Sequence, residues 1–400
     1  MATHDDLPGT PRLLRAINDR AALRLLLEHG RLSRTELGTL TGLSKPTASQ
    51  MLTRLEAAGL VLPVEGTATG GPGRVAQLYE LNPTAGFALA VDVTPESTRA
   101  VVVDLLGNHV GDADLPRTGD DAVDLFRRAR ERALAAAGVG ATDITHTVVA
   151  LPGAYDNATR TLRHARHLPG WHRDGVFAEL GELLEGRVEF ENDVNLLALA
   201  ELHQGASVGT GTSVLLWSAS GIGAAVVVGG RLHRGATGSA GELGYLPVPG
   251  APLVREVNQD TGGFEQSVGE PGLLELARRH GVPGGSPEQV VAAASPGGEF
   301  LAELATRYAT GIAAVVAVLD PEVVVFSGPV AEAGDEVLRA LVEREIAALA
   351  MRPVPVRLGT ILHDPVLTGA THVAVTRLRD NVFDSAGAPD ARSGERSAGS

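Results

Sequence analysis

A run of polar side chains between residues 44 and 54 has the spacing and chemistry of a surface that contacts nucleic acid. On a helix that begins near Ser44, these side chains face outward, away from the apolar positions between them. Glutamine bonds adenine with two hydrogen bonds, serine and threonine reach bases or phosphates, and lysine and arginine pair with phosphates. The outward set comprises Ser44, Lys45, Thr47, Ser49, Gln50, Thr53 and Arg54.

Two helices are expected to precede this run and to position it. Thr10-Pro11 is typical of a helix start, with proline in the first turn, and His29-Gly30 of its end. The apolar positions of this first helix are Leu14, Ile17, Ala21 and Leu25. Ser33-Arg34-Thr35-Glu36 is a capping box, which predicts that a second, short helix begins at Ser33.

A turn at Thr41-Gly42-Leu43 separates the second helix from a third one, which carries the polar run. The third helix is predicted to reach Ala58, with Gly59 as its stop. Its buried face has the i, i+3, i+4, i+7 spacing and consists of Ala48, Met51, Leu52 and Leu55. A positioning helix, a tight turn and a recognition helix together predict a helix-turn-helix.

A β-hairpin is predicted next, with strands at Leu60-Val61-Leu62 and Gln77–Leu81 around the loop EGTATGGPGR. Such a hairpin would be a wing, and the negative potential of a minor groove would attract its Arg74. The alternative is a three-helix protein-interaction module with a solvated polar face. For each residue taken singly, this interaction module stays open as an alternative. The capping box, the turn glycine, the small polar face and the basic wing together favour a DNA-binding domain.

The charge distribution agrees with a DNA-reading head on a different kind of body. Residues 1–82 contain nine basic and eight acidic side chains, so the other 25 basic and 40 acidic side chains leave the rest of the chain at −15. The overall charge of −14 argues against a chain that coats nucleic acid along its length. The only lysine in the sequence is Lys45.

The composition limits the kinds of site and the cellular location that are expected for this chain. There is no cysteine, which excludes disulfides and thiolate metal sites. No apolar run approaches the roughly 20 residues that span a bilayer. The opening MATHDDLPGT lacks the basic and apolar segments of a secretory signal. We therefore expect a soluble, cytoplasmic protein without a membrane partner.

From Phe87 the pattern changes to alternating strands and helices, which predicts an α/β body. Strands are expected in FALAVDV, RAVVVDL, HTVVALPG, RVEFEND and EVVVFSGP, and helices in DAVDLFRRARERALAAAGV and NLLALAELH. A strand–turn–strand opening occurs near residue 87 and again near residue 213, which hints at an internal duplication.

The stretch from INDRAALRLLLEHG through GLSKPTASQ to LEAAGLV, with the GGPGR wing after it, resembles the head of repressors of the ROK family, named for repressors, open reading frames and sugar kinases. The resemblance covers nearly all of residues 10–378. It implies operator binding by a symmetric oligomer, a homodimer or a dimer of dimers. It also implies a two-lobed, actin/hexokinase-like body of the sugar-kinase type.

The resemblance also implies a sugar site in the body. LPGAYDNATRTL looks like a sugar-domain segment, and its Gly153 matches. EFENDVNLLALAE looks like the segment that holds the catalytic aspartate of the kinases, with Asn192 as a sugar-bonding amide and Asp193 at the aspartate. The remaining matches are Glu242 and, at the family's histidine, Tyr245 in HRGATGSAGELGY, and Glu265 in GGFEQSVGEPGLLE.

Carboxylates and an amide suit a polyol, because each bonds hydroxyls that donate and accept. For two of these residues an alternative stays open: Asn192 and Asp193 are also favoured types at the start of the following helix, which they would merely cap.

The departures from the family pattern argue against catalysis. The kinases carry a D-x-G-x-T phosphate loop. Here Asp92 is kept, but Thr94-Pro95-Glu96 stands where G-x-T is expected. Proline lacks an amide donor, and Glu96 places negative charge beside phosphates. The second phosphate turn reads SASGIGA, keeping Gly221 and Gly223, and the adenosine-side segment keeps Gly328. ATP binding, and therefore phosphoryl transfer, is not expected, so no catalytic residue and no cofactor is assigned.

The family's zinc motif is also lost. Alignment on Glu265 puts Glu256, Asn258 and Gly263 at the three cysteine positions, and Tyr245 at the histidine. No soft ligand remains for a tetrahedral zinc site. Tyr245 also replaces a residue that borders the sugar site, although tyrosine stacks on a sugar face and donates one hydrogen bond.

These observations predict four segments: a flexible N-terminus at 1–9, a winged helix-turn-helix at 10–82, a ROK sugar-kinase-like effector and oligomerisation domain at 83–379, and a disordered tail at 380–400. The expected function is a transcriptional repressor that binds double-stranded operator DNA and senses a small carbohydrate. Two alternatives stay open: an active sugar kinase with a regulatory head, and a regulator whose body only oligomerises.

Overall fold

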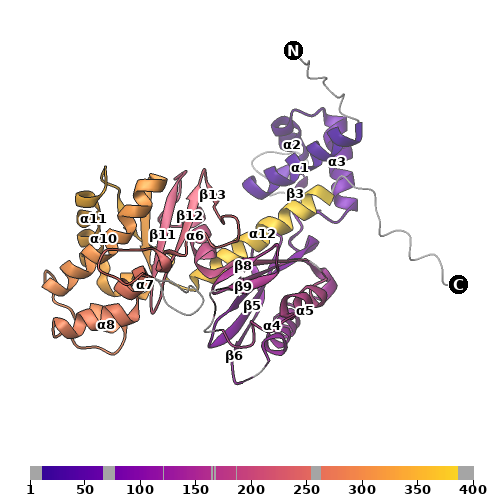
Figure 1. Cartoon of the computed structure of the whole chain (residues 1–400). Helices are drawn as coiled ribbons and strands as arrows, with labels where there is room; N and C mark the ends of the chain where they lie inside the picture. The colour runs from indigo at the N-terminus through magenta and orange to yellow at the C-terminus, as the bar shows by residue number, and fades with distance from the viewer. Residues whose placement is uncertain are drawn as a thin grey trace, which may run out of the picture.

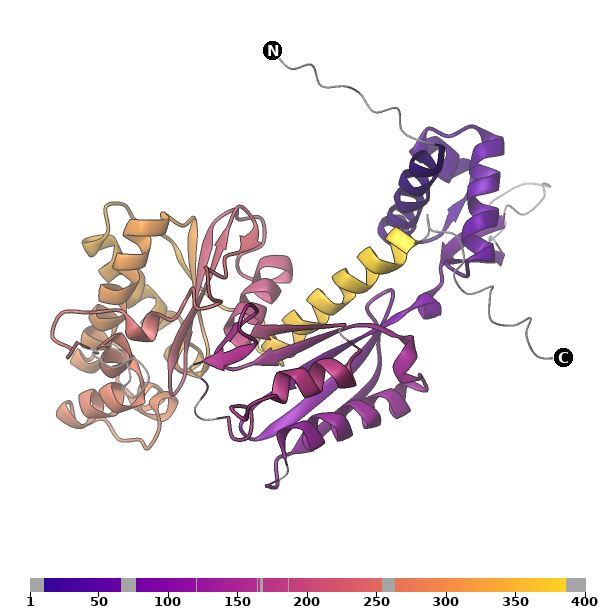
Figure 2. The ribbon, with the colours of Figure 1, turned by 45° about the vertical axis from the view of Figure 1, so that its right-hand side comes forward.

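The computed structural model describes residues 11–65, 77–119, 121–163, 165, 168–185, 187–253 and 263–385. They form a small N-terminal head and a body of two lobes (Figure 1). The head lies at one end of the molecule, the first lobe lies next to it, and the second lobe lies at the far end (Figure 2). A long helix, α12 (Pro365–Ser385), connects the lobes with the head.

The head is a winged helix-turn-helix, as the sequence predicts. Ser33 caps α2 with both bonds of the capping box, and Gly42 ends α2 in the left-handed region at φ 68°. The wing strands β2 and β3 pair with each other, and β1 adds an unpredicted third strand beside β3. The elements are α1 (Pro11–His29), β1 (Leu32–Ser33), α2 (Arg34–Thr41), α3 (Lys45–Ala57), β2 (Val61–Glu65) and β3 (Gln77–Leu81).

The apolar face of α3 is the predicted one, whereas that of α1 is not. Ala48, Met51, Leu52 and Leu55 are all buried. In α1 the predicted apolar positions Leu14 and Ile17 are each 54% exposed. The helix buries Ala22, Leu23 and Leu26 instead. The prediction was wrong because α1 packs on α2, α3 and α12 through its C-terminal half, so distant partners choose its buried side.

The first lobe is a five-stranded sheet with a different layer on each face. In β4, Leu89 and Val91 face the core that holds α4 and α5, whereas Ala88 and Ala90 face the core that holds α12, as alternation along a strand requires. The strand order is β10-β7-β4-β5-β6. The elements are η1 (Pro83–Ala85), β4 (Phe87–Val93), β5 (Ser97–Asp104), β6 (His109–Pro116), α4 (Ala122–Ala137), η2 (Ala141–Asp143), β7 (Ile144–Leu151), β8 (Ala154–Asp156), β9 (Thr161–Arg163), α5 (Val176–Leu183), β10 (Val188–Asn192) and α6 (Asp193–Gln204).

The second lobe repeats the first sheet's plan with the order β13-β12-β11-β14-β15. In both sheets an antiparallel meander of three strands comes first, and two parallel strands are added beside its first strand. This repeat agrees with the predicted duplication. The elements are β11 (Ser213–Ser218), β12 (Ile222–Val228), β13 (Arg231–Leu232), η3 (Leu243–Tyr245), α7 (Gly263–Val268), α8 (Glu270–Arg279), α9 (Pro287–Ala293), α10 (Glu299–Leu319), β14 (Val323–Ser327), α11 (Pro329–Leu349) and β15 (Val356–Leu358).

Among the described helices, α10 is long and apolar enough to cross a membrane. Half of its apolar stretch is buried inside the protein, where it contributes Leu304, Tyr308 and Ile312 to the core of the second lobe. This burial is typical of the core helix of a globular domain.

Helix α12 continues beyond the predicted start of the tail. The sequence predicts disorder from residue 380, but the helix runs to Ser385. Val382 and Phe383 are buried, at 6% and 3% exposure, which explains the extra turn. Residues 386–400 lie outside the described part.

Head and first lobe share one hydrophobic core through α12. Leu23 and Leu26 of α1 belong to the same buried cluster as Leu378 and Phe383 of α12. At the edge of this contact, Arg20 donates hydrogen bonds to Asp380 (3.0 Å) and Asp384. The head is therefore packed against the body as well as tethered to it.

Candidate functional site

The polar run of the sequence lies on the outer side of α3. Ser44, Lys45, Thr47, Gln50 and Thr53 are exposed, and Ser49 is partly exposed. Ser44 Oγ caps the helix by accepting from Thr47 N at 3.4 Å, and it lies 2.8 Å from Thr47 Oγ1. Within the described chain, Lys45 and Gln50 have no side-chain partner. The first turns of α3 thus offer a cation and an amide to a ligand.

Arg54 is engaged within the head. Its Nη2 donates to Asp19 Oδ1 at 2.6 Å, and Asp19 is only 2% exposed. Burial raises the pKa of Asp19, whereas the hydrogen bond and charge of Arg54 act to lower it. Arg54 therefore holds α3 on α1, a role that the sequence did not predict. The predicted wing residue Arg74 lies outside the described residues.

Arg54→Ala is expected to lower the free energy of unfolding by about 2 kcal/mol. A fully buried pair that loses one partner costs about 3–5 kcal/mol, and Arg54 is partly exposed. Thermal unfolding of the purified chain measures the loss. The control Lys45→Ala removes an exposed cation of the same helix and should leave Tm unchanged. Equal Tm values for the two variants would refute the structural role of Arg54.

In the body, the structure brings Gly153, Asn192 and Asp193 together. Asn192 Nδ2 donates to Gly153 O at 3.1 Å and to Asp193 Oδ1 at 3.0 Å. Asn192 Oδ1 accepts from Asn195 N at 3.0 Å, so Asn192 is also the N-cap of α6. The capping role weighed from the sequence therefore exists together with the placement beside Asp193. Gly153 has φ 101°, and a Cβ there would lie 2.4 Å from Arg163 O, so the turn requires glycine.

Glu242 reaches the same region from the second lobe. It precedes η3, whose last residue is the partly exposed Tyr245. Gly241 brings this segment against β12, because its φ is 100° and a Cβ would lie 2.0 Å from Ala224 O. The predicted residue Glu242 is thus placed by a backbone contact that only glycine allows.

Glu265 of α7 lies against the turn between β11 and β12. Its Oε2 accepts from Ile222 N at 3.0 Å. A Cβ added to Gly221, Gly244 or Gly269 would lie within 3.4 Å of the carboxylate oxygens, so these glycines make room for it. A carboxylate therefore takes a backbone amide of the turn that corresponds to a phosphate turn in the kinases.

Asp193, Glu242 and Glu265, together with Asp92, form a group of carboxylates contributed by both lobes, which we call the cleft. They share an electrostatic environment. Burial raises the pKa of Asp193 to about 6. Burial and the neighbouring Asp193 raise the pKa of Asp92 to about 7. Burial, Asp193 and Glu265 raise the pKa of Glu242 to about 7. Asp92, at the end of β4, is a member that the sequence analysis noted but did not count as a ligand. Such a cluster favours groups that donate hydrogen bonds, and it disfavours anions.

The first phosphate loop is folded on itself. Thr94 Oγ1 accepts from Ser97 N at 3.0 Å and from Glu96 N at 3.3 Å. Its hydroxyl is therefore engaged within its own turn. With Glu265 on the Ile222 amide, each of the two turns that resemble phosphate turns has donors that are engaged within the protein.

Neither of the described positions of the zinc motif offers a soft ligand. Tyr245 stands at the histidine, and Gly263 begins α7. Glu256 and Asn258 lie outside the described residues. The described residues hold no group of three or more His, Asp or Glu side chains arranged for a metal ion.

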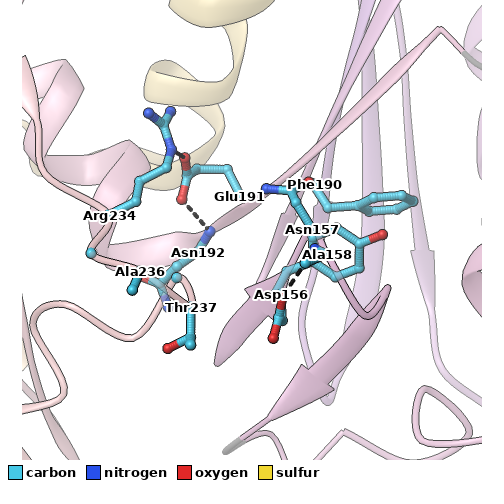
Figure 3. Close-up of a pocket in the computed structure, with 12 residues that line it drawn as sticks. Asp156, Asn157, Ala158, Phe190, Glu191, Asn192, Arg234, Ala236 and Thr237 are labelled. Carbon is cyan, nitrogen blue, oxygen red and sulfur yellow. Dashed lines mark hydrogen bonds and ion pairs between the residues drawn. The ribbon is translucent and has the colours of Figure 1, made fainter.

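A pocket of about 230 Å³ adjoins the cleft (Figure 3). Of the six predicted ligand residues, only Asn192 lines it. The other lining residues are Tyr155, Asp156, Asn157, Ala158, Phe190, Glu191, Arg234, Gly235, Ala236, Thr237 and Gly238. Sequence reasoning did not name them: they lie in the three segments that resemble family motifs, but the resemblance marks other positions of those segments as ligands.

The raised pKa values predict a pH-dependent stability. A carboxyl group whose pKa is higher in the folded than in the unfolded chain stabilises the fold at low pH and loses that contribution as pH rises towards the folded pKa. For Asp92, Asp193 and Glu242 this window lies between about pH 4 and pH 7. Tm should fall between pH 5 and pH 8, by about 1 °C for each kcal/mol of stability that a chain of this size loses.

Scanning calorimetry at several pH values measures this change. Asp92→Asn and Glu242→Gln should each flatten the fall, while Glu96→Gln, at an exposed position, should not. The lowered pKa of Glu189, about 2, acts below this window, whereas the lowered pKa of His372, about 4, opposes part of the fall up to about pH 6.5. A Tm that rises with pH in all variants would contradict the clustering.

Comparison with known proteins agrees with this geometry. The ROK family matches residues 88–375, and a winged helix-turn-helix DNA-binding family matches residues 15–61. The xylose repressor of Caldicellulosiruptor bescii is 23% identical over 357 residues, which cover 84% of this chain and 88% of the repressor. The glucokinase of Thermotoga maritima is 28% identical over 243 residues, or 56% of this chain and 75% of the enzyme.

The fold is also that of a solved protein. A ROK family transcriptional regulator, described as a homologue of the Mlc protein of E. coli, superimposes with a TM-score of 0.72 at 20% identity, covering 94% of this chain and 99% of that one. Because the family match takes in both lobes and the described cleft, the chain belongs to the ROK family and carries a winged helix-turn-helix at its N-terminus.

Proposed function

We propose that this protein is a transcriptional repressor whose kinase-like body binds a sugar and does not phosphorylate it. One observation carries the proposal: an exposed recognition surface on α3 is joined to a carboxylate cleft whose phosphate turns are closed by Thr94 and Glu265. In this proposal the head binds DNA, and the cleft binds the sugar that regulates this binding.

The DNA contact is assigned to the outer face of α3. Lys45 is exposed in its first turn, where a recognition helix meets the duplex, and Gln50 lies one to two turns further on. Arg54 has a structural role, so phosphate contacts fall to Lys45 and the small hydroxyl residues. The xylose repressor similar to this chain supports operator DNA as the partner.

The cleft is assigned to a neutral carbohydrate. Asp193 and Glu242 lie in each other's electrostatic range, and hydroxyl donors satisfy such carboxylates without adding negative charge. Relatives named for xylose and for glucose make pentoses and hexoses the first candidates. Gly153, Asn192, Tyr245 and Glu265 complete the proposed contact set.

A path for the signal runs along α6 and α12. Helix α6 begins at Asp193, and it packs on α12. The other end of α12 shares its core with α1. Closure of the lobes on a sugar would therefore shift the head. Couplings of this kind are typically about 1–3 kcal/mol, enough to weaken operator binding several-fold.

A two-fold operator would need two heads, so a homodimer or a dimer of dimers belongs to the proposal. A location in the cytoplasm, with the chromosome, follows from the same function. No cofactor is assigned.

A sugar kinase with a regulatory head is the second candidate. The pKa of Asp193, about 6, suits a general base, and a glucokinase is among the relatives. The inward-turned phosphate loops oppose it. ATP-dependent phosphorylation of a hexose or an aminosugar that is lost in Asp193→Ala would establish this alternative.

A gel-shift assay with DNA from the promoter region of the protein's own gene tests the proposal. Retardation at moderate salt should be relieved by xylose, glucose or a related sugar. Lys45→Ala should weaken binding to all sequences and flatten its salt dependence by about one unit. Arg278→Ala, which removes an exposed cation from the second lobe, is the control.

Absence of retardation would refute the regulator. Retardation that no sugar relieves would leave a regulator whose body only oligomerises. If Lys45→Ala bound like the wild type, the recognition surface would lie elsewhere on the head.

A further inference from the structure

The pocket beside Asn192 lies between segments of different lobes (Figure 3). Asp156, Asn157 and Ala158 belong to the β8–β9 hairpin of the first lobe, and Arg234, Ala236 and Thr237 belong to the segment after β13 in the second lobe. The two walls touch at one end, where a Cβ on Gly238 would lie 2.5 Å from Tyr155 O. Any group bound here therefore contacts both lobes.

The charges of the pocket are paired among themselves. Glu191 accepts from Arg234 Nε at 2.5 Å and from Asn195 Nδ2 at 2.8 Å. Asp156 accepts from Ala158 N at 2.9 Å and from Arg163 Nη2 at 3.1 Å. No lining cation is left without a carboxylate, so phosphate and carboxylate ligands find no counter-charge.

The rim of the pocket offers neutral hydrogen-bonding groups. Asn157, Gly235, Ala236 and Thr237 are exposed. Thr237 Oγ1 donates to Ser239 Oγ at 3.3 Å and keeps its acceptor capacity. These groups match hydroxyls, which donate and accept.

Asn192 borders both the pocket and the carboxylate of the cleft. The same side chain lines the pocket and donates to Asp193. A substituent on a ring that is bound against Asp193 would therefore reach the pocket by passing Asn192. Its volume of about 230 Å³ is below the roughly 300–1,000 Å³ of sites that enclose a whole ligand, so it suits one part of a ligand.

We infer that this pocket is a subsite for a second, neutral sugar ring, so that the effector is a disaccharide or a longer glycoside. This inference rests on the proposed sugar-binding cleft. The second ring would bridge the hairpin and the segment after β13, and it would hold the lobes together more firmly than a single ring at Asp193 can.

Isothermal titration calorimetry on the full chain tests the inference with matched sugars: xylose against xylobiose, and glucose against cellobiose, maltose and glucose 6-phosphate. One disaccharide should bind at least about tenfold more tightly than its own monosaccharide, a difference of about 1.4 kcal/mol. Ala236→Trp fills the pocket and should remove that advantage while leaving the monosaccharide affinity within about twofold.

Ala348→Trp, the same change at an exposed position of α11, is the control and should keep the advantage. Thr237→Val is a second, milder test, which should reduce only the disaccharide affinity. Equal affinity for mono- and disaccharides would overturn the subsite and leave the sensing function intact. Tightest binding of glucose 6-phosphate would overturn its neutral character. Absence of binding by every sugar would refute the cleft itself.

Discussion

The fold of this protein depends on one helix, α12, whose buried side belongs to a core that the head and the first lobe share. Along its length α12 packs on α6, on the first sheet and on α1. Its apolar side contributes Leu367 and Ala370 near the lobes and Val382 and Phe383 at the head to one buried cluster. Because protein cores are close-packed, a rigid helix in such a cluster cannot move at one end without a response at the other. The head therefore packs against the body through α12, and Arg20 adds hydrogen bonds to α12 at the edge of this contact.

The cleft gathers carboxylates in a body of the sugar-kinase type. Asp92, Asp193 and Glu242 keep negative charge close together, and burial raises the pKa of each. Glu265 accepts from the Ile222 amide, so this amide is engaged within the protein. Hydroxyl donors relieve this arrangement, whereas a nucleotide would add charge to it. In the proposed function, a body of the sugar-kinase type keeps the carboxylates that are proposed to bind the sugar.

Sequence reasoning succeeded where the signals are local. The Ser33–Glu36 capping box, the glycine turn at Gly42 and the apolar spacing of α3 each lie within a few residues, and the structure has all three. It failed where the partner is distant. The buried side of α1 is chosen by α12, the last turn of α12 is ordered by the head, and Arg54 meets Asp19 35 positions away. The cleft residues were named because they match family motifs, whereas the pocket residues beside Asn192 lie in the same segments at positions that the resemblance does not distinguish.

Hydrogen–deuterium exchange on the full chain, with and without a saturating sugar, tests the central claim that the cleft and the head are coupled through α12. The account predicts altered protection in α6, in the C-terminal half of α12 and in α1, although the sugar contacts neither α1 nor the end of α12. Changes confined to the cleft and the pocket, with α1 and the last turns of α12 unaltered, would contradict it.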